Sequence, residues 1–369
     1  MNDKFNIENE DNMEKEKKSK IKKILVNLTI FILLIILTFS LVLKDQDVSQ
    51  IFSVAAKVKK QYILFAVLAM SIYILGEAVN ITRILKELGE KSKLISNIRY
   101  TLIGFFFSAI TPAASGGQPM EIYYMHKDDI SVANSTLALL MQLCSLQIVT
   151  ITVGTISAVI HFEVLKSGLI YLLILGIILN SSALMLLIIA IFSKKLSEGL
   201  IKFAVKLLKF FRIPNVEKKQ EKLEKELESY QTSAKYIKEH KILMLKTVIT
   251  TVVQMIAYYS VPYWIYLAFG LTEYNIFEIL TLQAVLYATV SGIPSPGAVG
   301  VSEGGFLGIF KNVFPETIIS SAMLLTRGAN FYLFIIISAI IVMISTFREK
   351  RIEKKQMQET EVLTEKSEK

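Results

Sequence analysis

The sequence predicts an all-α, polytopic membrane protein with about six full spans and two re-entrant or broken helical segments in an inverted pseudo-repeat. Three observations lead to this prediction. The 369 residues are 53% apolar and 20% charged, with a mean hydropathy of +0.49, whereas soluble chains of this size carry more charge. Apolar runs of about 20 residues, long enough to cross the hydrocarbon core, recur along the chain. Two of the apolar runs lead into proline- and glycine-rich stretches that resemble each other.

The clear spans are expected at residues 24–43, 62–79, 133–160, 168–192, 247–269 and 318–347. The first span follows a long charged segment and has no small-residue cleavage pattern after it, so we expect a retained helix and not a cleaved signal. The resulting organisation is a charged N-terminus (1–23), a first membrane half (24–192) with a broken motif at 108–121, a basic amphipathic and charged connector (193–246), a second membrane half (247–347) with a broken motif at 291–305, and a charged tail (348–369).

Lysine and arginine concentrate beside the apolar runs, at 15–23, 83–99, 194–246 and after 347. The positive-inside rule predicts that these segments, and therefore both termini, lie in the cytoplasm. Residues 99–129 would then start and end inside, and residues 276–315 would start and end outside. Each segment is either a re-entrant hairpin or a pair of full spans, and approach from opposite faces is typical of an inverted-topology repeat.

The two broken motifs share an order of residues. Each begins with serine, a small residue and isoleucine, at Ser108 and Ser291, passes through proline and then glycine, and reaches a carboxylate, Glu121 or Glu303. Proline and glycine break helices and leave backbone groups unpaired. Within a bilayer, such backbone is tolerated only where it is buried in protein or lines a wet cavity. The motifs therefore predict a substrate site near the midplane.

Three charged residues are candidates for that site. Glu303 would be costly at membrane depth unless paired, protonated or hydrated, which favours function over a solvated surface loop. Arg327, inside the last span, either binds a phosphate with its planar fork or forms an ion pair with Glu303. Glu121 either mirrors Glu303 or is an interfacial cap beside His126 and Lys127.

Small and turn-forming residues complete the candidate substrate site, because exposed N–H groups in such turns form anion-binding nests. A phosphate would suit this environment, and a tight helix turn without a ligand is the alternative. The further candidates are Gly116, Gly117, Gln118, Pro294, Pro296, Gly297, Gly300 and Gly304.

Other polar and aromatic residues of the spans have simpler interpretations. Interhelical hydrogen bonding is the usual role of amides inside spans, and it is expected for Gln142, Gln147, Asn180, Gln254 and Gln283. An interfacial aromatic belt is expected where tyrosine and tryptophan cluster toward one end of a span, here Tyr258, Tyr259, Tyr263, Trp264 and Tyr266.

The sequence contains no motif of a soluble catalytic domain, so we expect no catalytic residue and no cofactor. Its three histidines lie far apart and Cys144 is its single cysteine, which gives no metal-ligand spacing. The net charge of +9 does not predict nucleic-acid binding, because no soluble domain is left to carry it.

The motifs at 111–119 and 294–305 resemble those of the lysylphosphatidylglycerol synthase transmembrane-region family, the flippase-like domain of the bacterial multiple peptide resistance factor. The resemblance extends over residues 24–347. It implies inverted repeats with re-entrant segments, a bacterial cell membrane location, and translocation of lysyl-phosphatidylglycerol, phosphatidylglycerol or a related anionic or aminoacylated lipid between leaflets.

The resemblance leaves alternatives open. Full-length resistance factors carry a cytosolic domain that transfers lysine from lysyl-tRNA to phosphatidylglycerol, and we expect no such domain in this chain, where only charged residues 348–369 follow the last span. One alternative is the phosphatidylglycerol lysyltransferase itself, or a part of that system, linked to resistance to cationic antimicrobial peptides. Another is an ion-coupled transporter of a small solute. The expected partner is a membrane phospholipid, and a separate lipid synthase or a second copy of the chain would be compatible with this role.

Overall fold

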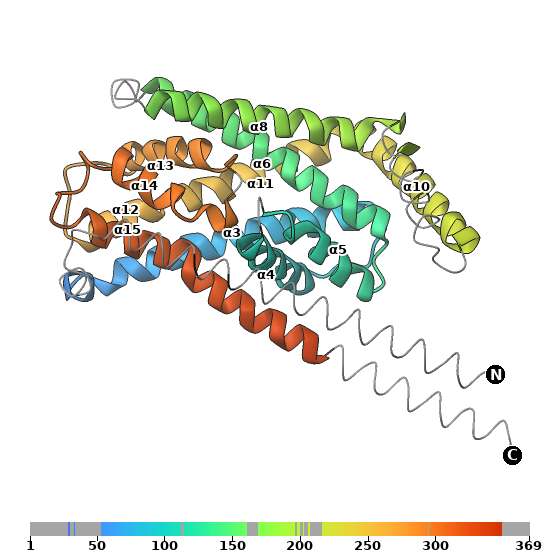
Figure 1. Cartoon of the computed structure of the whole chain (residues 1–369), viewed down its shortest axis with the longest axis horizontal. Helices are drawn as coiled ribbons and strands as arrows, with labels where there is room; N and C mark the ends of the chain where they lie inside the picture. Colours follow the sequence, from blue (N-terminus) through green and yellow to red (C-terminus); the bar gives the residue numbers. More distant parts are fainter. Residues whose placement is uncertain are drawn as a thin grey trace, which may run out of the picture.

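The computed structural model describes residues 53–111, 114–160, 169–195, 198–199, 216–293 and 295–348, and single positions 29, 33, 202 and 206. These ranges form helices and contain no strand (Figure 1). The expectation of an all-α membrane protein is confirmed. Large apolar side chains such as Ile178, Met185 and Leu186 are more than half exposed on the outer face of one long helix, as expected of a surface that contacts lipid.

Five helices of the described ranges are long and apolar enough to cross a membrane: Lys60–Glu87 (α3), Val132–Ile160 (α6), Ile170–Phe192 (within α8, Leu169–Phe192), Lys241–Ala268 (α11, Lys241–Tyr259, followed by α12, Val261–Ala268) and Ile319–Arg348. They coincide with five of the six predicted spans. The sixth, at residues 24–43, lies outside the described residues.

Each broken motif forms a helical hairpin. Leu94–Ile110 (α4) packs on Gly117–Lys127 (α5), and Ile276–Val290 (α13) packs on Val301–Ile309 (α14). An 11-residue α5 and a 9-residue α14 extend only about 16 and 14 Å, roughly half of a 30 Å hydrocarbon core. Of the two alternatives for these segments, the helix lengths favour re-entrant hairpins over pairs of full spans.

The two hairpins lie at opposite ends of the bundle. In Figure 1, α4 and α5 lie toward the end that holds Val216–Glu239 (α10), whereas α13 and α14 lie toward the other end. Their tips approach each other, because α4 contacts the short turn Pro296–Ala298 (η2) of the second hairpin. The arrangement is the one expected of inverted hairpins that meet inside the bundle.

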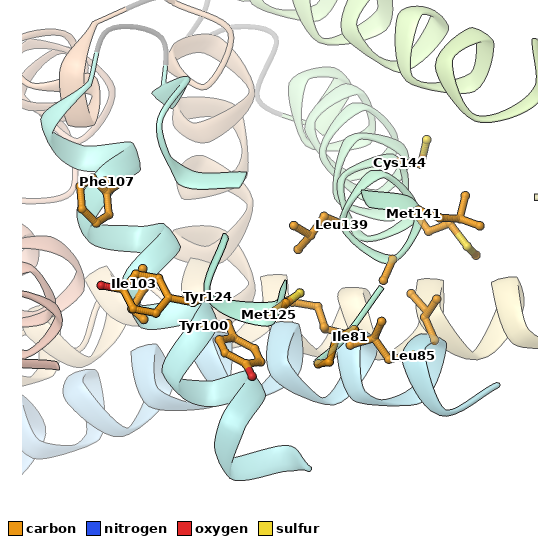
Figure 2. Close-up of a cluster of buried hydrophobic side chains, with 14 of the residues drawn as sticks. Ile81, Leu85, Tyr100, Ile103, Phe107, Tyr124, Met125, Leu139, Met141 and Cys144 are labelled. Carbon is orange, nitrogen blue, oxygen red and sulfur yellow. The ribbon is translucent and has the colours of Figure 1, made fainter. Parts of the chain in front are cut away.

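Each hairpin is anchored in its own hydrophobic cluster. Ile81 and Leu85 of α3, Ile103 of α4 and Met125 of α5 belong to the cluster around the first hairpin (Figure 2). A separate cluster surrounds the second hairpin and joins α12, α13 and α14 with Ile319–Arg327 (α15). Because the two clusters are separate, the polar motifs can meet between them.

Amides connect the spans, as the sequence predicts, at Gln142, Asn180 and Gln254, whereas the side-chain oxygens of Gln147 and Gln283 have no hydrogen-bond partner among the described residues. Asn80 of α3 donates to Gln142 of α6 at 2.9 Å, and Gln142 donates to Gln254 of α11 at 3.3 Å. Asn180 of α8 donates to the Ala288 carbonyl of α13 at 3.2 Å. Such bonds satisfy polar groups that would otherwise lie unpaired in an apolar interior.

The charged connector helix α10 docks on the bundle. Glu226 accepts from the backbone N–H of Ala133 at 3.0 Å, at the start of α6, and Tyr230 donates to the Ala190 carbonyl of α8 at 2.9 Å. Ala234 and Ile237 of this helix are buried. The helix is thus more than a solvated linker, because one of its faces is part of the packed structure.

Helix α13, which leads into the second broken motif, begins with a capping box. The Asn275 side chain accepts from the N–H groups of Phe277 and Glu278, and Glu278 accepts from the N–H of Asn275. We expect Asn275→Ala to lower the free energy of unfolding by about 1 kcal/mol, because two N–H groups lose their acceptor. Denaturant titration in detergent micelles measures this difference. Asn312→Ala, in the loop after α14, is the matched control and should leave stability unchanged.

Candidate functional site

The tip of the first hairpin is closed by a threonine. The Thr111 hydroxyl donates to the Phe107 carbonyl at 2.6 Å and accepts from the Gly116 N–H at 2.9 Å. These bonds satisfy a carbonyl at the end of α4 and an N–H at the start of α5, which helix termini leave unpaired. The chain can therefore reverse direction inside the bundle with few unsatisfied backbone groups.

The tip of the second hairpin depends on left-handed backbone. Gly297 has φ 58° and Gly300 has φ 86°, conformations that residues with a Cβ rarely adopt. The Gly300 N–H donates to Glu303 at 2.8 Å, so this carboxylate caps the start of α14. An acidic group is favourable at this end of a helix because it faces the positive end of the helix dipole.

The same carboxylate forms a buried ion pair. Arg327 Nε donates to Glu303 Oε1 at 2.8 Å, and the Tyr332 hydroxyl donates to that oxygen at 3.1 Å. Glu303 is 0% exposed and Arg327 7% exposed. Arg327 Nη2 also donates to the Gly297 carbonyl at 3.1 Å, which ties the last span to the hairpin tip.

A π-helical segment, Gly328–Tyr332 (η3), interrupts the last span directly after Arg327. Such segments occur often at functional sites. The segment brings the Phe331 ring to 4.0 Å from the guanidinium carbon of Arg327, and Phe331 also packs against Gly297. The arginine is therefore held between a carboxylate and an aromatic ring, in a fixed orientation.

A cavity of ≈ 290 Å³ lies where the two hairpin tips meet. Its wall includes Ser108 and Ala114 from the first motif, Ser291 and Ser295 from the second, and Arg327 from the last span. Hydroxyl groups and one guanidinium thus face a space bounded by both motifs. Phosphate oxygens accept hydrogen bonds from both kinds of group, and a cavity of this size admits a lipid headgroup more readily than a whole lipid.

The structure separates the candidates of the second half into three groups. Gly297 and Arg327 line the cavity, and Glu303 contacts Arg327 behind the cavity wall. Pro296 begins the turn that carries Gly297, and Gly300 caps α14. Gly304 is exposed with open space beside it, and Pro294 lies outside the described residues.

The candidates of the first half lie within the hairpin. Gly117 is buried against Ser108 and Gly104, and Gly116 packs on Thr111. Gln118 is half-buried at the start of α5. Glu121 is 3% exposed and lies against α4, not on the cavity wall, so it does not join Glu303 at Arg327. An interfacial cap is excluded by this burial.

Three tyrosines of the cavity wall were missed by sequence reasoning: Tyr73 of α3, Tyr258 of α11 and Tyr287 of α13. The belt interpretation is wrong for Tyr258, which lines the cavity, and for Tyr259 and Tyr266, which are at most 1% exposed. The position of Tyr258 within its span could have shown that it is not a belt residue. Tyr258 lies about two thirds of the way along the 28-residue span Lys241–Ala268, ten residues before its end, whereas belt residues lie at span ends.

No metal centre is evident within the described ranges, where no three His, Cys, Asp or Glu side chains come together as potential ligands.

Comparisons with known proteins give one finding. No curated protein matches the chain, but residues 24–338 match the family described as "Lysylphosphatidylglycerol synthase TM region". The match spans both hairpins and the helices that surround the cavity. This chain belongs to the lysylphosphatidylglycerol synthase TM region family and is a membrane protein of the lysylphosphatidylglycerol system.

Proposed function

We propose that this protein moves a phospholipid of the phosphatidylglycerol or lysyl-phosphatidylglycerol type between the two leaflets of a bacterial cell membrane. The observation that carries the proposal is the cavity between the two hairpin tips, with Arg327 in its wall. A headgroup phosphate would bind there while the acyl chains remain in the bilayer. Both termini lie in the cytoplasm in this proposal, as the distribution of lysine and arginine predicts.

The charges at the cavity suit a phosphate headgroup. Arg327 uses Nε and Nη2 for Glu303 and Gly297, and it still lines the cavity. A guanidinium has five N–H donors, so a phosphate can bind without breaking the ion pair.

The bundle also offers a surface for acyl chains. The hairpin helices do not span the bilayer, and their tips lie among apolar helices whose outer faces carry exposed Leu, Ile and Met side chains. A lipid can therefore keep its tails in an apolar environment as its headgroup crosses. The headgroup needs this polar route, separate from that of the tails, because transfer of a charged headgroup through hydrocarbon is costly.

Lipid translocation in proteoliposomes tests the proposal. Fluorescent phosphatidylglycerol, its lysyl derivative and phosphatidylcholine are reconstituted separately, and a membrane-impermeant quencher reports the label that reaches the outer leaflet. We expect wild type to move at least one of the first two lipids faster than protein-free vesicles. We expect the double variant Glu303→Gln/Arg327→Gln to fall to the protein-free rate, because the cavity loses its phosphate ligand.

The matched control changes an exposed pair of the same chemistry. Glu221 and Lys225 of α10 form an ion pair at 2.7 Å on the surface, and Glu221→Gln/Lys225→Gln should translocate lipid as wild type does. If wild type moves neither phosphatidylglycerol nor its lysyl derivative, or if the cavity variant translocates at the wild-type rate, the proposed function is wrong.

A further inference from the structure

A second pair of carboxylates lies outside the cavity, Glu77 on α3 and Glu121 on α5. Glu121 is 3% exposed, and its Oε2 has no hydrogen-bond partner among the described residues. Its carboxyl group lies against Gly104 of α4, where a Cβ would come within 2.8 Å of Glu121 Cγ. Glu77 interacts electrostatically with Glu121. Glycine at position 104 therefore makes room for a buried carboxyl group.

No cation balances this pair within the described ranges. The arginines of α3 and α4 are engaged elsewhere: Arg83 donates to Asn80 and to the Lys246 carbonyl, and Arg99 pairs with Asp128. Glu303 differs, because Arg327 compensates its charge. A carboxylate as deeply buried as Glu121, next to the half-buried Glu77 and without a cation, is costly as an anion, and a proton bound to the pair removes that cost.

A tyrosine one turn from Glu77 reaches the cavity wall. Tyr73 lies one turn before Glu77 on the same face of α3, interacts electrostatically with Glu77 and Tyr287, and lines the cavity. The rings of Tyr73 and Tyr258 lie 5.2 Å apart. Tyrosine hydroxyls both donate and accept hydrogen bonds, which is the property that a proton relay between Glu77 and the cavity requires.

Several other ionisable groups on helices that pack against the pair have partners of their own. Arg99 and Tyr100 of α4 bind Asp128, and Tyr332 of η3 binds Glu303. Tyr259 of α11 is buried without a hydrogen-bond partner among the described residues and interacts electrostatically with Tyr73. The ionisable groups that connect the pair to the cavity are Tyr73 of α3, Tyr258 of α11 and Tyr287 of α13.

We propose that Glu77 and Glu121 form a proton-binding site, and that proton uptake and release at this site are coupled to occupation of the cavity by a lipid headgroup. The O–H bond forms on one carboxylate oxygen as a hydronium ion of the solvent gives up a proton and becomes water, and it breaks when the proton passes back to a solvent water by way of the tyrosines. The coupling rests on the proposed lipid translocation, whereas the proton site itself does not.

Infrared spectroscopy of the purified protein tests the site without any transport. We expect wild type at neutral pH to show the C=O band of a protonated carboxylic acid, which shifts in deuterated water and disappears as the pH is raised. Glu121→Gln and Glu77→Gln should each lose the band, Glu121→Asp should retain one, and the exposed Glu221→Gln should leave it unchanged. A wild-type protein without a titrating band overturns the proposal, whatever the variants do.

A pH gradient across proteoliposomes tests the coupling. We expect the initial rate of lipid translocation by wild type to depend on the direction of the gradient, and Glu121→Gln to lose that dependence. Wild type that moves lipid at one rate under either gradient overturns the coupling and leaves the proposed function intact. If wild type moves no lipid at all, both the proposed function and the coupling are overturned. In that case the infrared band still tests whether Glu77 and Glu121 bind a proton.

Discussion

Arg327→Gln alone is expected to destabilise the protein by about 3–5 kcal/mol, whereas Glu303→Gln/Arg327→Gln should cost considerably less. The single substitution leaves Glu303 as an uncompensated carboxylate at 0% exposure, with only Tyr332 and the Gly300 N–H as hydrogen-bond donors among the described residues. The double substitution removes both charges, so no buried ion remains without a partner. The reversal of the usual order, with two changes milder than one, is the signature of a buried ion pair.

A double-mutant cycle measures this effect. Free energies of unfolding of wild type, both single variants and the double variant, obtained by denaturant titration in detergent micelles, give the interaction energy of the pair. The exposed pair Glu221 and Lys225 is the control, where each single change should cost less than about 1 kcal/mol. Equal costs for Arg327→Gln and for the double variant would contradict a buried, mutually dependent pair.

The ion pair of Glu303 and Arg327 also shows how much of the site could be predicted from the sequence. Position within the last span identified Arg327, and the second broken motif identified Glu303, but phosphate binding and an ion pair with Glu303 remained equally open. The structure shows the ion pair and places Arg327 in the cavity wall as well. The two roles are compatible, because Arg327 uses Nε and Nη2 for Glu303 and the Gly297 carbonyl, and a guanidinium has further N–H donors.

The membrane spans were predictable because their signal is local. A run of about 20 apolar residues forms a transmembrane helix in a bilayer, and five of the expected spans are helices in the structure. The broken motifs were predictable for the same reason, since proline and glycine act on the backbone where they occur.

The cavity wall was less predictable because it depends on distant helices. Tyr73, Tyr258 and Tyr287 come from three different helices, and no single segment shows that their hydroxyl groups face one space. The burial of the Glu121 carboxyl group was difficult to predict for the same reason. Its sequence neighbours His126 and Lys127 suggested an interfacial cap, and only the packing of α5 on α4 against Gly104 shows its burial.

Gly176→Leu is expected to destabilise the protein by about 1–3 kcal/mol or more and to abolish lipid translocation. At Gly176, α8 packs against the backbone of α13. A Cβ at this position would lie 2.8 Å from both Cα and O of Thr289. Backbone atoms cannot rotate away as a side chain can, so the two helices must separate. The shift would also break the hydrogen bond from Asn180 to the Ala288 carbonyl.

The consequence for function follows from the position of α13. This helix ends at Val290 and leads directly into Ser291, which lines the cavity, so a displaced α13 moves the tip of the second hairpin away from Arg327. Gly304→Leu is the matched control, because the exposed Gly304 has open space beside it and leucine favours a helix over glycine by up to about 1 kcal/mol. Unfolding and translocation are measured on both variants. Unchanged stability and translocation in Gly176→Leu would show that α8 does not hold the second hairpin in place.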